Sequence, residues 1–373
     1  MSEKHINIIS FDIPFPADYG GVIDVFYKIK SLHEQGIKIH LHCFEYGREQ
    51  QEELNKYAVE VFYYPRNMAK VNLLSSKPFI VVSRKHEQLI ENILNNNYPI
   101  LFEGLHCCAY INDERLKNRL KIVRTHNIEH DYYSNLASVE KNWIKEYYFI
   151  RESRRLEKFE SNLKYANKIA TISKNDLNYF SSKYANCQHI SAFHPNITVK
   201  IKPGKGDFAL YHGNLGVGEN NQAALFLVNQ IFSDLNYPLI IAGNKASKEL
   251  INAVESNKNA RLISDVDNDT INQLIEDAQI NILPTFQATG IKLKLLAALY
   301  RGRHCVVNSP MVKDTGLECL CNIEDLKDEM KAKIIELSKI DFTDSMIEKR
   351  AQLLNKDFSN LMQVEKLVKL IWN

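Results

Sequence analysis

The sequence lacks any long hydrophobic run. Its 373 residues contain no apolar stretch that approaches the roughly 18 residues a membrane-spanning helix needs. The N-terminal residues MSEKHINIISFDI lead almost directly into an apolar strand, without the layout of a secretory signal peptide. These absences argue against a spanning helix and against export, so we expect a cytoplasmic protein.

The sequence also lacks the paired cysteines of a disulfide framework or a zinc site. It has 7 cysteines, an odd number, and neither Cys107-Cys108 nor Cys319-Leu320-Cys321 has the CxxC spacing of zinc-binding and redox motifs. Because export is not expected, we expect reduced thiols and assign these cysteines no function.

The chain has little net charge, formally +2, so any basic surface must be local. Residues 115–124 hold five basic side chains and no acidic one, and residues 141–168 hold eight basic and four acidic ones together with Trp143, Tyr147 and Tyr148. Such a basic N-terminal surface could contact an anionic membrane that carries a lipid-linked acceptor, although a solvated helix face is the commoner explanation. No RNA- or DNA-binding module is recognisable, so we expect no nucleic-acid partner.

Apolar runs alternate with helical patterns through the first half of the chain. The predicted strands cover residues 5–13, 37–44, 59–63, 100–102, 121–125 and 168–172. A loop with prolines and glycines follows the first strand, and residues 22–35 then repeat apolar side chains at helical spacing until Gly36. Further helices are predicted over residues 84–94 and 140–166. Strand, glycine-bearing loop, helix and strand form the first unit of a doubly wound fold.

The alternation stops and restarts near the middle of the chain. Residues 193–207 are rich in proline, glycine and lysine, which is typical of a linker. The predicted strands beyond it cover residues 208–212, 238–242, 261–264, 280–283 and 304–307, with helices over 221–232, 248–256 and 270–278. We therefore predict an α/β protein with two Rossmann-like domains that face each other across a cleft. The predicted boundaries are 1–195 and 196–356, followed by a C-terminal helical segment, 357–373.

The stretch 279–308 organises the second predicted domain. A buried strand, a proline and a short polar loop lead to a helix that opens at Gly290. The Thr289-Gly290 pair at this helix start would present backbone N–H groups that attract an anion. In an open α/β sheet such a loop lies at the carboxyl end of a strand, where ligands bind. We predict a phosphate-binding loop here, although an ordinary strand–helix turn fits these residues equally well.

Four segments carry a resemblance to a known family. They are PFPADYGGVIDVFYKIKSLHEQGIKIHLHC, KIVRTHNIEHDYY, ALYHGNLGVGENNQAALFL and DAQINILPTFQATGIKLKLLAALYRGRHCVVN. The chain resembles glycosyltransferases of the GT-B fold, particularly the retaining transferases that use nucleotide-activated sugars in surface polysaccharide synthesis. The resemblance implies that 1–195 binds the acceptor, that 196–356 binds the nucleotide sugar, and that 357–373 forms a helix packing back on the first domain.

The resemblance implies a donor site built mainly by the second domain. Thr289, Gly290, Ile291 and Lys292 would offer the diphosphate a helix start, a close approach and a positive charge, without a metal or a cofactor. The further donor-binding positions that the resemblance implies are Gly20, Gly21, Gly213, Asn214 and Lys245. A plain tight turn is the alternative for the first two glycines, and a solvated loop lysine is the alternative for the last residue.

The resemblance assigns the catalytic position to His126, which ends a predicted strand in the sequence RTHNIEH. In the family the matching histidine contacts the donor sugar, and the alternative is a structural histidine at a strand end. The acceptor-binding positions that the resemblance implies are Asp18, Glu103, His106 and Glu129. Asp18 could instead begin a turn, and Glu129 could be the first-turn acid of a helix.

One position departs from the family pattern. The family usually has two glutamates eight positions apart, the second of which binds the donor ribose, and here these positions are Thr289 and Ala297. A methyl group cannot accept hydrogen bonds from ribose hydroxyls. The sequence favours transfer of a sugar, with retention, from a nucleotide-diphosphate sugar to a glycan or lipid-linked acceptor. The alternatives are a catalytically impaired scaffold that binds sugar nucleotides or glycans, and a sugar-nucleotide epimerase of the same fold.

Overall fold

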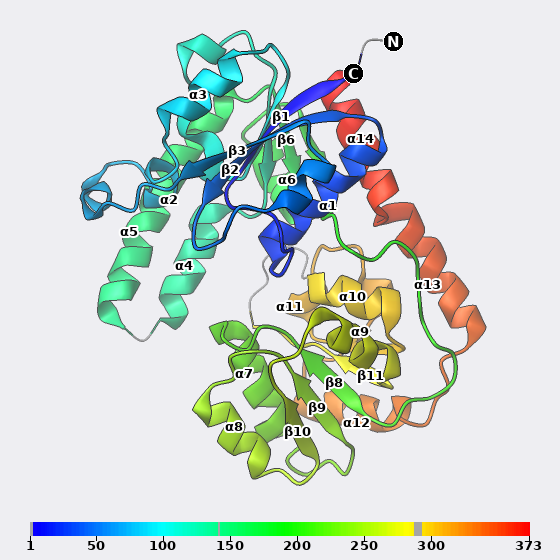
Figure 1. The fold of residues 1–373 in the computed structure, drawn as a ribbon. Coiled ribbons are helices and arrows are strands. Elements are labelled where there is room, and N and C mark those ends of the chain that lie inside the picture. The colour runs from blue at the N-terminus through cyan, green and yellow to red at the C-terminus, as the bar shows by residue number, and fades with distance from the viewer. Residues whose placement is uncertain (1–2, 141, 287–292) are drawn as a thin grey trace. The chain divides into compact units, whose positions relative to one another are not determined.

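The computed structural model describes residues 3–140, 142–286 and 293–373, which form two compact units (Figure 1). The first unit comprises Met1–Pro195 and Ser359–Asn373, and the second comprises Asn196–Phe358. Each unit is built on a sheet of parallel strands flanked by helices, so the predicted class of two Rossmann-like domains is confirmed.

Seven parallel strands form the sheet of the first unit, in the order β3-β2-β1-β4-β5-β6-β7. The strands are β1 (His5–Ser10), β2 (Lys38–Glu45), β3 (Glu60–Pro65), β4 (Ile100–Glu103), β5 (Lys121–Thr125), β6 (Lys168–Thr171) and β7 (Cys187–His189). The strand order reverses between β1 and β4. Connections therefore leave these two strands in opposite directions, which makes their carboxyl ends the expected ligand-binding edge.

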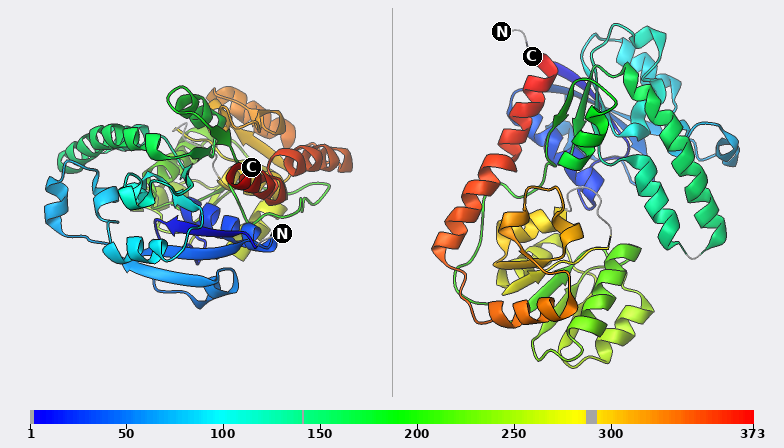
Figure 2. Two further views of the ribbon diagram at one scale, coloured as in Figure 1. Left: turned by 90° about the horizontal axis from the view of Figure 1, so that it is seen from above. Right: turned by 180° about the vertical axis from the view of Figure 1, so that it is seen from behind.

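Helices cover both faces of this first sheet, as the two views in Figure 2 show. The α-helices are α1 (Gly20–Glu34), α2 (Phe79–Val82), α3 (Glu87–Leu94), α4 (Glu129–Val139), α5 (Trp143–Glu160), α6 (Lys174–Ser181) and α14 (Asn360–Trp372). The 3-10 helices are η1 (Glu52–Lys56), η2 (Lys70–Leu74), η3 (Leu105–Tyr110), η4 (Glu114–Leu116) and η5 (Ser161–Tyr165). Neighbouring strand residues point to opposite faces, so Leu101 packs with α1 and α14 whereas Phe102 packs with α3 and α5. Burial on both faces explains why these strands are almost continuously apolar.

The C-terminal helix α14 belongs to the first unit, as predicted. Its buried residues Val364, Leu367 and Ile371 join the apolar cluster that α1 forms with the sheet. Lys168 Nζ at the start of β6 also donates a hydrogen bond to Leu370 O. The last helix thus completes the core of the domain in which the chain began (Figure 2).

The helix predicted over residues 140–166 has different bounds, and a second helix precedes it. The side chain of Asn142 accepts hydrogen bonds from the backbone N–H groups of Ile144 and Lys145, and this N-cap begins α5. Helix α4 ends before it and packs along α5 as a helical hairpin. The prediction began this helix three residues early because it included the capping residue, and it did not include α4.

Six parallel strands form the sheet of the second unit, in the order β10-β9-β8-β11-β12-β13. The strands are β8 (Ala209–His212), β9 (Leu239–Ala242), β10 (Ala260–Ile263), β11 (Ile280–Ile282), β12 (His304–Val307) and β13 (Asn322–Ile323). The helices are α7 (Gly218–Phe226) with its π-helical extension η6 (Leu227–Ile231), α8 (Lys248–Glu255), α9 (Asn268–Asp277), α10 (Leu293–Arg301), α11 (Ser309–Val312), η7 (Glu318–Leu320), α12 (Lys327–Leu337) and α13 (Asp344–Asp357). The order reverses between β8 and β11, which again marks a ligand-binding edge. In the part of the chain that is described, no helix is long and apolar enough to cross a membrane.

Candidate functional site

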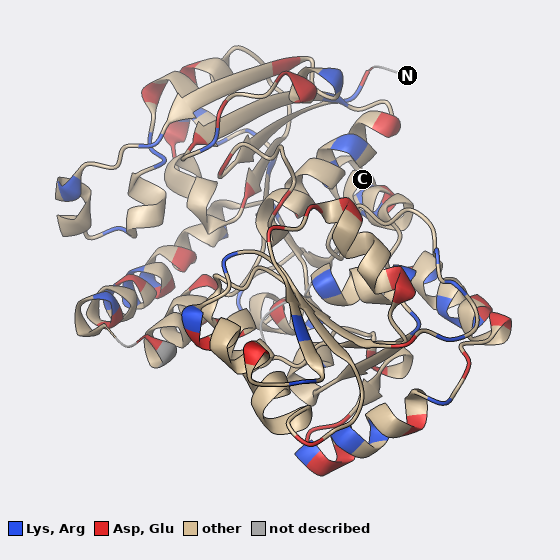
Figure 3. Ribbon diagram, turned by 60° about the horizontal axis from the view of Figure 1, so that its bottom comes forward, with Lys and Arg blue, Asp and Glu red and all other residues tan. Residues whose placement is uncertain are grey.

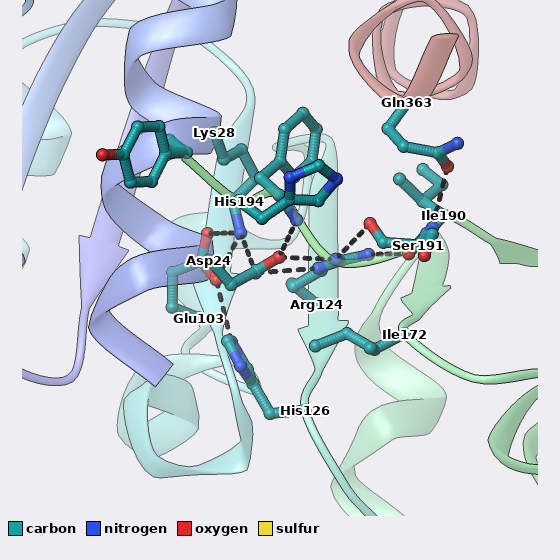
Figure 4. Close-up of polar contacts among 12 residues, drawn as sticks. Asp24, Lys28, Glu103, Arg124, His126, Ile172, Ile190, Ser191, His194 and Gln363 are labelled. Carbon is teal, nitrogen blue, oxygen red and sulfur yellow. Dashed lines mark hydrogen bonds and ion pairs between the residues drawn. The ribbon is translucent and has the colours of Figure 1, made fainter. Parts of the chain in front are cut away.

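In the first unit, a histidine and a glutamate meet at the carboxyl ends of β4 and β5. Glu103 is the last residue of β4, and His126 directly follows β5. His126 Nε2 lies 3.1 Å from Glu103 Oε2, and both side chains are at least nine-tenths buried (Figure 4). The structure therefore joins a predicted catalytic residue to a predicted acceptor-binding residue.

A buried network of charges surrounds this pair, and the sequence analysis did not predict it. Lys28 Nζ lies 2.8 Å from Asp24 Oδ2, one turn earlier on α1, and 2.8 Å from Glu103 Oε1. Arg124, on β5, donates from Nη2 to Asp24 Oδ1 at 2.9 Å and to Ser191 O at 3.0 Å. Two cations thus balance two carboxylates in the protein interior, as Figure 4 shows.

The network keeps both carboxylates ionised. Burial by itself raises the pKa of Asp24, but Arg124 and Lys28 outweigh it and hold this pKa well below its ordinary value. Burial likewise raises the pKa of Glu103, and Lys28 and the hydrogen bond from His126 bring it below its usual range. An ionised carboxylate only accepts hydrogen bonds, so the Nε2 atom of His126 is the donor.

Asp24, Glu103 and His126 each offer one possible metal-ligand atom, and these atoms lie within 4.8 Å of one another. The ammonium group of Lys28 already contacts both carboxylates, however, and supplies the positive charge that a metal would bring. This arrangement fits an internal ion-pair network better than a metal site. The absence of a metal or cofactor requirement stays a prediction.

His106 and Glu129, two further predicted acceptor residues, lie beside His126. His106 Nδ1 faces Glu129 Oε1 at 3.8 Å, and neither atom has a hydrogen-bond partner among the described residues. The ring of Phe11 contacts His106 and His126, at centroid distances of 5.5 and 5.4 Å. Gly104 has a φ of +75°, and a Cβ at this position would lie 2.8 Å from His106 Nδ1, so glycine lets the ring approach the backbone.

Burial sets the protonation states of these two groups. It raises the pKa of Glu129 to about 8, with a further increase from Asp176, so this carboxyl is mostly protonated at neutral pH. Burial and the nearby Arg84 hold the pKa of His106 well below its usual range. Glu129 also opens α4, so it is a first-turn residue of a helix as well as a neighbour of the site.

The glycine loop of the first unit opens α1, as predicted. Gly20 is the first residue of α1, and Gly21 packs against the ring of Phe11. Asp18 lies just before this helix, and its carboxylate pairs with Arg48. Arg48 also donates to Pro16 O at 2.8 Å and so fixes this loop, a role that no sequence motif indicated.

The basic run 115–124 does not form a basic surface patch. Arg119, Lys121 and Arg124 are buried and donate hydrogen bonds to backbone carbonyls or to Asp24. Arg115 is exposed but pairs with Asp113 at 2.7 Å. The basic helix α5 alternates charges of both signs, as the red and blue segments of the α4–α5 hairpin in Figure 3 show.

In the second unit, the loops that follow β8 and β9 lie together at the carboxyl edge of the sheet. Asn214 Oδ1 accepts a hydrogen bond from Gly216 N, and Leu215 N donates to Asn244 O in the neighbouring loop at 3.0 Å. A Cβ on Gly216 would lie 3.0 Å from the side chain of Lys245, so this exposed lysine leans over the loop after β8. The structure thus places the predicted donor residues Gly213, Asn214 and Lys245 side by side.

Lys245 adopts an unusual backbone conformation, with a φ of +61°. A non-glycine residue in this left-handed region costs about 1 kcal/mol or more, and such residues cluster at functional sites. Asn186, Asp265 and Asp314 share this conformation, so the donor-binding role of Lys245 stays a prediction.

Helix α10 contributes a second lysine to the same edge, which the sequence analysis had not assigned. Lys294 donates to Asn220 Oδ1 at 2.9 Å and to Tyr211 OH at 3.2 Å. Nearby, Thr285, early in the loop that follows β11, donates a hydrogen bond to Glu219 in the first turn of α7. These bonds tie α7, α10 and the end of β8 together at the carboxyl edge of the sheet.

Thr289, Gly290, Ile291 and Lys292 lie outside the described residues. Ala297, on α10, packs against the apolar cluster of Leu210, Ala242, Ile275 and Ala278 and carries no carboxylate.

Most of the second unit matches a known protein family. Residues 207–339 match the family described as Glycosyl transferases group 1. A Klebsiella pneumoniae protein described as an uncharacterized 44.6 kDa protein in the cps region is 27% identical over 338 residues, covering 83% of this chain and 84% of that protein.

Solved structures resemble the whole chain. A sucrose-phosphate synthase from Thermosynechococcus elongatus has a TM-score of 0.72 at 13% identity and covers 99% of this chain and 98% of its own. A mutant of S. aureus TarM in complex with Fondaparinux, alpha-GlcNAc-glycerol and UDP has a TM-score of 0.66 at 11% identity, with all of both chains covered. Anabaena HepE in complex with UDP and glucose has a TM-score of 0.65 at 10% identity, over 98% of this chain and 99% of its own.

Two parallel-sheet domains, each with a ligand-binding edge, together with these neighbours define the GT-B fold. The chain is a glycosyltransferase of this fold, and residues 207–339 of its second unit match the glycosyl transferases group 1 family.

Proposed function

We propose that this protein transfers a sugar from a nucleotide-diphosphate sugar to a glycan or lipid-linked acceptor, with retention of the anomeric configuration. The observation that carries the proposal is the group 1 match over residues 207–339, which spans the β8, β9 and β11 loops. UDP in the complexes of TarM and HepE supports a nucleotide sugar as donor. The cps region of the Klebsiella relative supports a role in surface polysaccharide synthesis.

The donor diphosphate binds to the second unit. Lys245 and Lys292 supply positive charge, and the backbone of Gly213, Thr289 and Gly290 approaches the phosphates closely. Negative charge that develops on the leaving diphosphate is stabilised by these groups without a metal ion. The position of Lys245 over the β8 loop supports this assignment.

His126 contacts the transferred sugar through the ring atom that Glu103 leaves available. Because Glu103 accepts from Nε2, Nδ1 stays available for a hydroxyl group of the sugar. His106 and Glu129 contact the acceptor, since their facing polar atoms have no other partner among the described residues. No residue acts as a covalent nucleophile in this proposal.

The experiment is a transfer assay with a panel of nucleotide sugars and glycan acceptors. We expect release of nucleoside diphosphate to depend on the acceptor, and we expect NMR of the product to show a retained anomeric configuration. His126→Ala should lower transfer at least about tenfold while nucleotide affinity changes little. Turnover without any acceptor would instead identify an epimerase, and an inverted product would overturn retention.

A catalytically impaired scaffold that binds sugar nucleotides or glycans is the second candidate function. The methyl group of Ala297, packed against α9, favours it because no carboxylate is present there to bind the donor ribose. Calorimetry with the same nucleotide sugars separates the two functions. Tight binding without turnover on any acceptor would support the scaffold and contradict the transferase.

We further propose a cytoplasmic location at the inner face of the membrane, where a lipid-linked acceptor would be met. Fractionation of cells that express the full chain tests this, with membrane recovery expected to depend on ionic strength.

A further inference from the structure

Two arginines of the first unit, Arg66 and Arg84, lie close together without an acidic partner. Arg66 Nη2 donates to Ser83 Oγ at 3.0 Å, in the residue that precedes Arg84. Arg84 donates from Nε to Phe11 O and from Nη1 to Ile80 O, both at 2.8 Å. Across the described part of the chain, neither guanidinium forms an ion pair.

Asp12 acts electrostatically on both arginines and Glu129 on Arg84, but among the described residues neither acid forms an ion pair with them. Asp12 accepts a hydrogen bond from Tyr19 OH at 2.8 Å. Its ion-pair partner is Arg48, at 3.9 Å. Glu129 has a pKa raised to about 8 by burial and is mostly protonated at neutral pH. Burial and the neighbouring Arg66 lower the pKa of Arg84 to about 10, so both arginines stay charged. The cluster therefore holds excess positive charge in a largely buried place.

Arg66 also has an unused donor. Its Nε atom is buried and has no hydrogen-bond partner among the described residues, and its guanidinium lies 4.2 Å from the ring centre of the exposed Tyr46. Since a buried donor without an acceptor is costly, such an atom indicates a missing partner. Arg66 is only partly buried, which leaves it open to a ligand from solvent.

We infer that Arg66 and Arg84 form a binding site for a phosphate or diphosphate group. The planar guanidinium matches phosphate oxygens with two parallel hydrogen bonds, and an anion supplies the counter-charge that these arginines lack. Both arginines influence His106 electrostatically, as does His126, so the site adjoins the catalytic edge. The further step, that this phosphate belongs to the sugar acceptor, rests on the proposed function.

The surface around the two arginines favours a lipid as the source of the phosphate. Residues 61–86 contain five lysines and arginines and no aspartate or glutamate. Within this segment Met68, Val71 and Leu74 are 45, 68 and 76% exposed, and Lys70 and Lys77 flank them. Figure 3 shows this loop beside α2 with basic but no acidic residues. Exposed apolar side chains among lysines fit an anionic membrane surface that holds a lipid-linked phosphate.

The first test is calorimetric titration of inorganic pyrophosphate into the full chain, with a nucleoside diphosphate in excess to occupy the donor site. We expect Arg66→Gln and Arg84→Gln each to weaken pyrophosphate binding about 10- to 100-fold. The matched control is Arg154→Gln on the exposed face of α5, which should bind like the wild type. Unchanged pyrophosphate affinity in Arg66→Gln would overturn the site.

The buried Arg84 could also be needed for folding, so its variants require a stability check. Thermal unfolding identifies a destabilised Arg84→Gln, and Arg84→Lys, which keeps the charge, should restore part of the affinity. Arg66 makes one side-chain hydrogen bond to Ser83 and is partly exposed, so Arg66→Gln tests the site independently of folding.

The second test identifies the source of the phosphate, with phosphatidylcholine vesicles that contain or lack a polyprenyl diphosphate. We expect co-flotation only with the diphosphate, and we expect Leu74→Asp to weaken it without changing pyrophosphate affinity. Pyrophosphate binding without vesicle binding would overturn the lipid source and indicate a soluble phosphorylated acceptor. If the protein binds pyrophosphate but transfers no sugar, the proposed function is contradicted and the phosphate site is still supported.

Discussion

His126 donates a hydrogen bond from Nε2 to Glu103 Oε2 at 3.1 Å, and Glu103 is itself held by Lys28 at 2.8 Å. This relationship fixes the orientation of the histidine and determines which ring nitrogen carries the proton. The chemistry proposed for the first unit depends on it.

Glu103→Gln tests this relationship directly. The amide of the glutamine can turn its NH₂ group toward His126. The Nε2 atom of the ring can then accept a hydrogen bond, so the proton is no longer held on Nε2 as it is by the carboxylate. We expect kcat to fall roughly 10- to 100-fold, with nucleotide affinity unchanged and an altered tautomer in the ¹⁵N NMR signals of the ring. Glu60→Gln, at the edge of the sheet where Glu60 pairs with His40, is the matched control and should leave kcat unchanged. If Glu103→Gln keeps the wild-type kcat, Glu103 does not fix the tautomer that His126 needs for transfer.

Lys28→Met should destabilise the protein strongly. It removes the ammonium group from between Asp24 and Glu103 and leaves two buried carboxylates with too little positive charge. The expected loss in the free energy of unfolding is about 3–5 kcal/mol, measured by urea denaturation. Lys30→Met on the same helix removes a charge that has no ion-pair partner among the described residues, and should cost far less. Similar losses in both variants would show that the buried charge network contributes little to the free energy of unfolding.

The two glycines that open α1 should respond differently to alanine. A Cβ on Gly20 meets no atom within 4 Å, whereas a Cβ on Gly21 would lie 2.7 Å from Phe11 Cζ. Phe11 would have to shift, and its ring contacts His126. We expect Gly21→Ala to lower kcat several-fold and Gly20→Ala to retain it, as measured in the transfer assay. Equal activities would mean that the ring of Phe11 does not position His126.

Lys292→Ala and Lys245→Ala should weaken binding of a nucleoside diphosphate about tenfold, because each removes a charge from the phosphates. Binding of the corresponding nucleoside should stay nearly unchanged, and calorimetry measures both. The control is Lys258→Ala, in the exposed loop before β10 at the opposite end of the strands. Equal losses for nucleoside and nucleoside diphosphate would count against a phosphate role.

Glu129 should make stability depend on pH. Burial raises its folded-state pKa from 4.5 to about 8, so the folded protein binds more protons than the unfolded chain between these values. Its contribution is complete below pH ~4.5 and is lost as the pH rises toward ~8, at up to about 1.4 kcal/mol per pH unit. Arg84 and His130, which favour the charged form, moderate this loss.

Glu129→Gln removes the titrating group and should flatten this part of the pH profile in urea denaturation. Glu91→Gln, at an exposed position of α3 with no ion-pair partner among the described residues, should leave the profile as it is. A Glu129→Gln profile parallel to that of the wild type would contradict the raised pKa.

Most of the fold could be predicted because its signals are local. The strands of both sheets are buried on two faces and therefore read as short apolar runs, such as 280–283 and 304–307, while helices show a 3.6-residue period. The start of α5 was predicted three residues early because it depends on one capping side chain, Asn142, and α4 before it was not predicted.

Parts of the candidate site could also be predicted, because parallel strands bring their carboxyl ends to one edge. Glu103 ends β4 and His126 directly follows the adjacent strand β5, and the sequence placed both near the catalytic edge. The sequence did not reveal that Asp18 is paired with Arg48, because that pairing depends on how a loop folds back.

The sequence by itself determined the two Rossmann-like domains and the positions of the glycine loops, because periodicity and glycine placement act over a few residues. Only the tertiary structure decided which charges are buried together. Asp24 and Arg124 are 100 positions apart, and Arg66 and Arg84 belong to a segment without regular periodicity. Charged residues look alike in sequence whether they are solvated or buried, and their partners are set by the register of strands and the packing of α1 on the sheet.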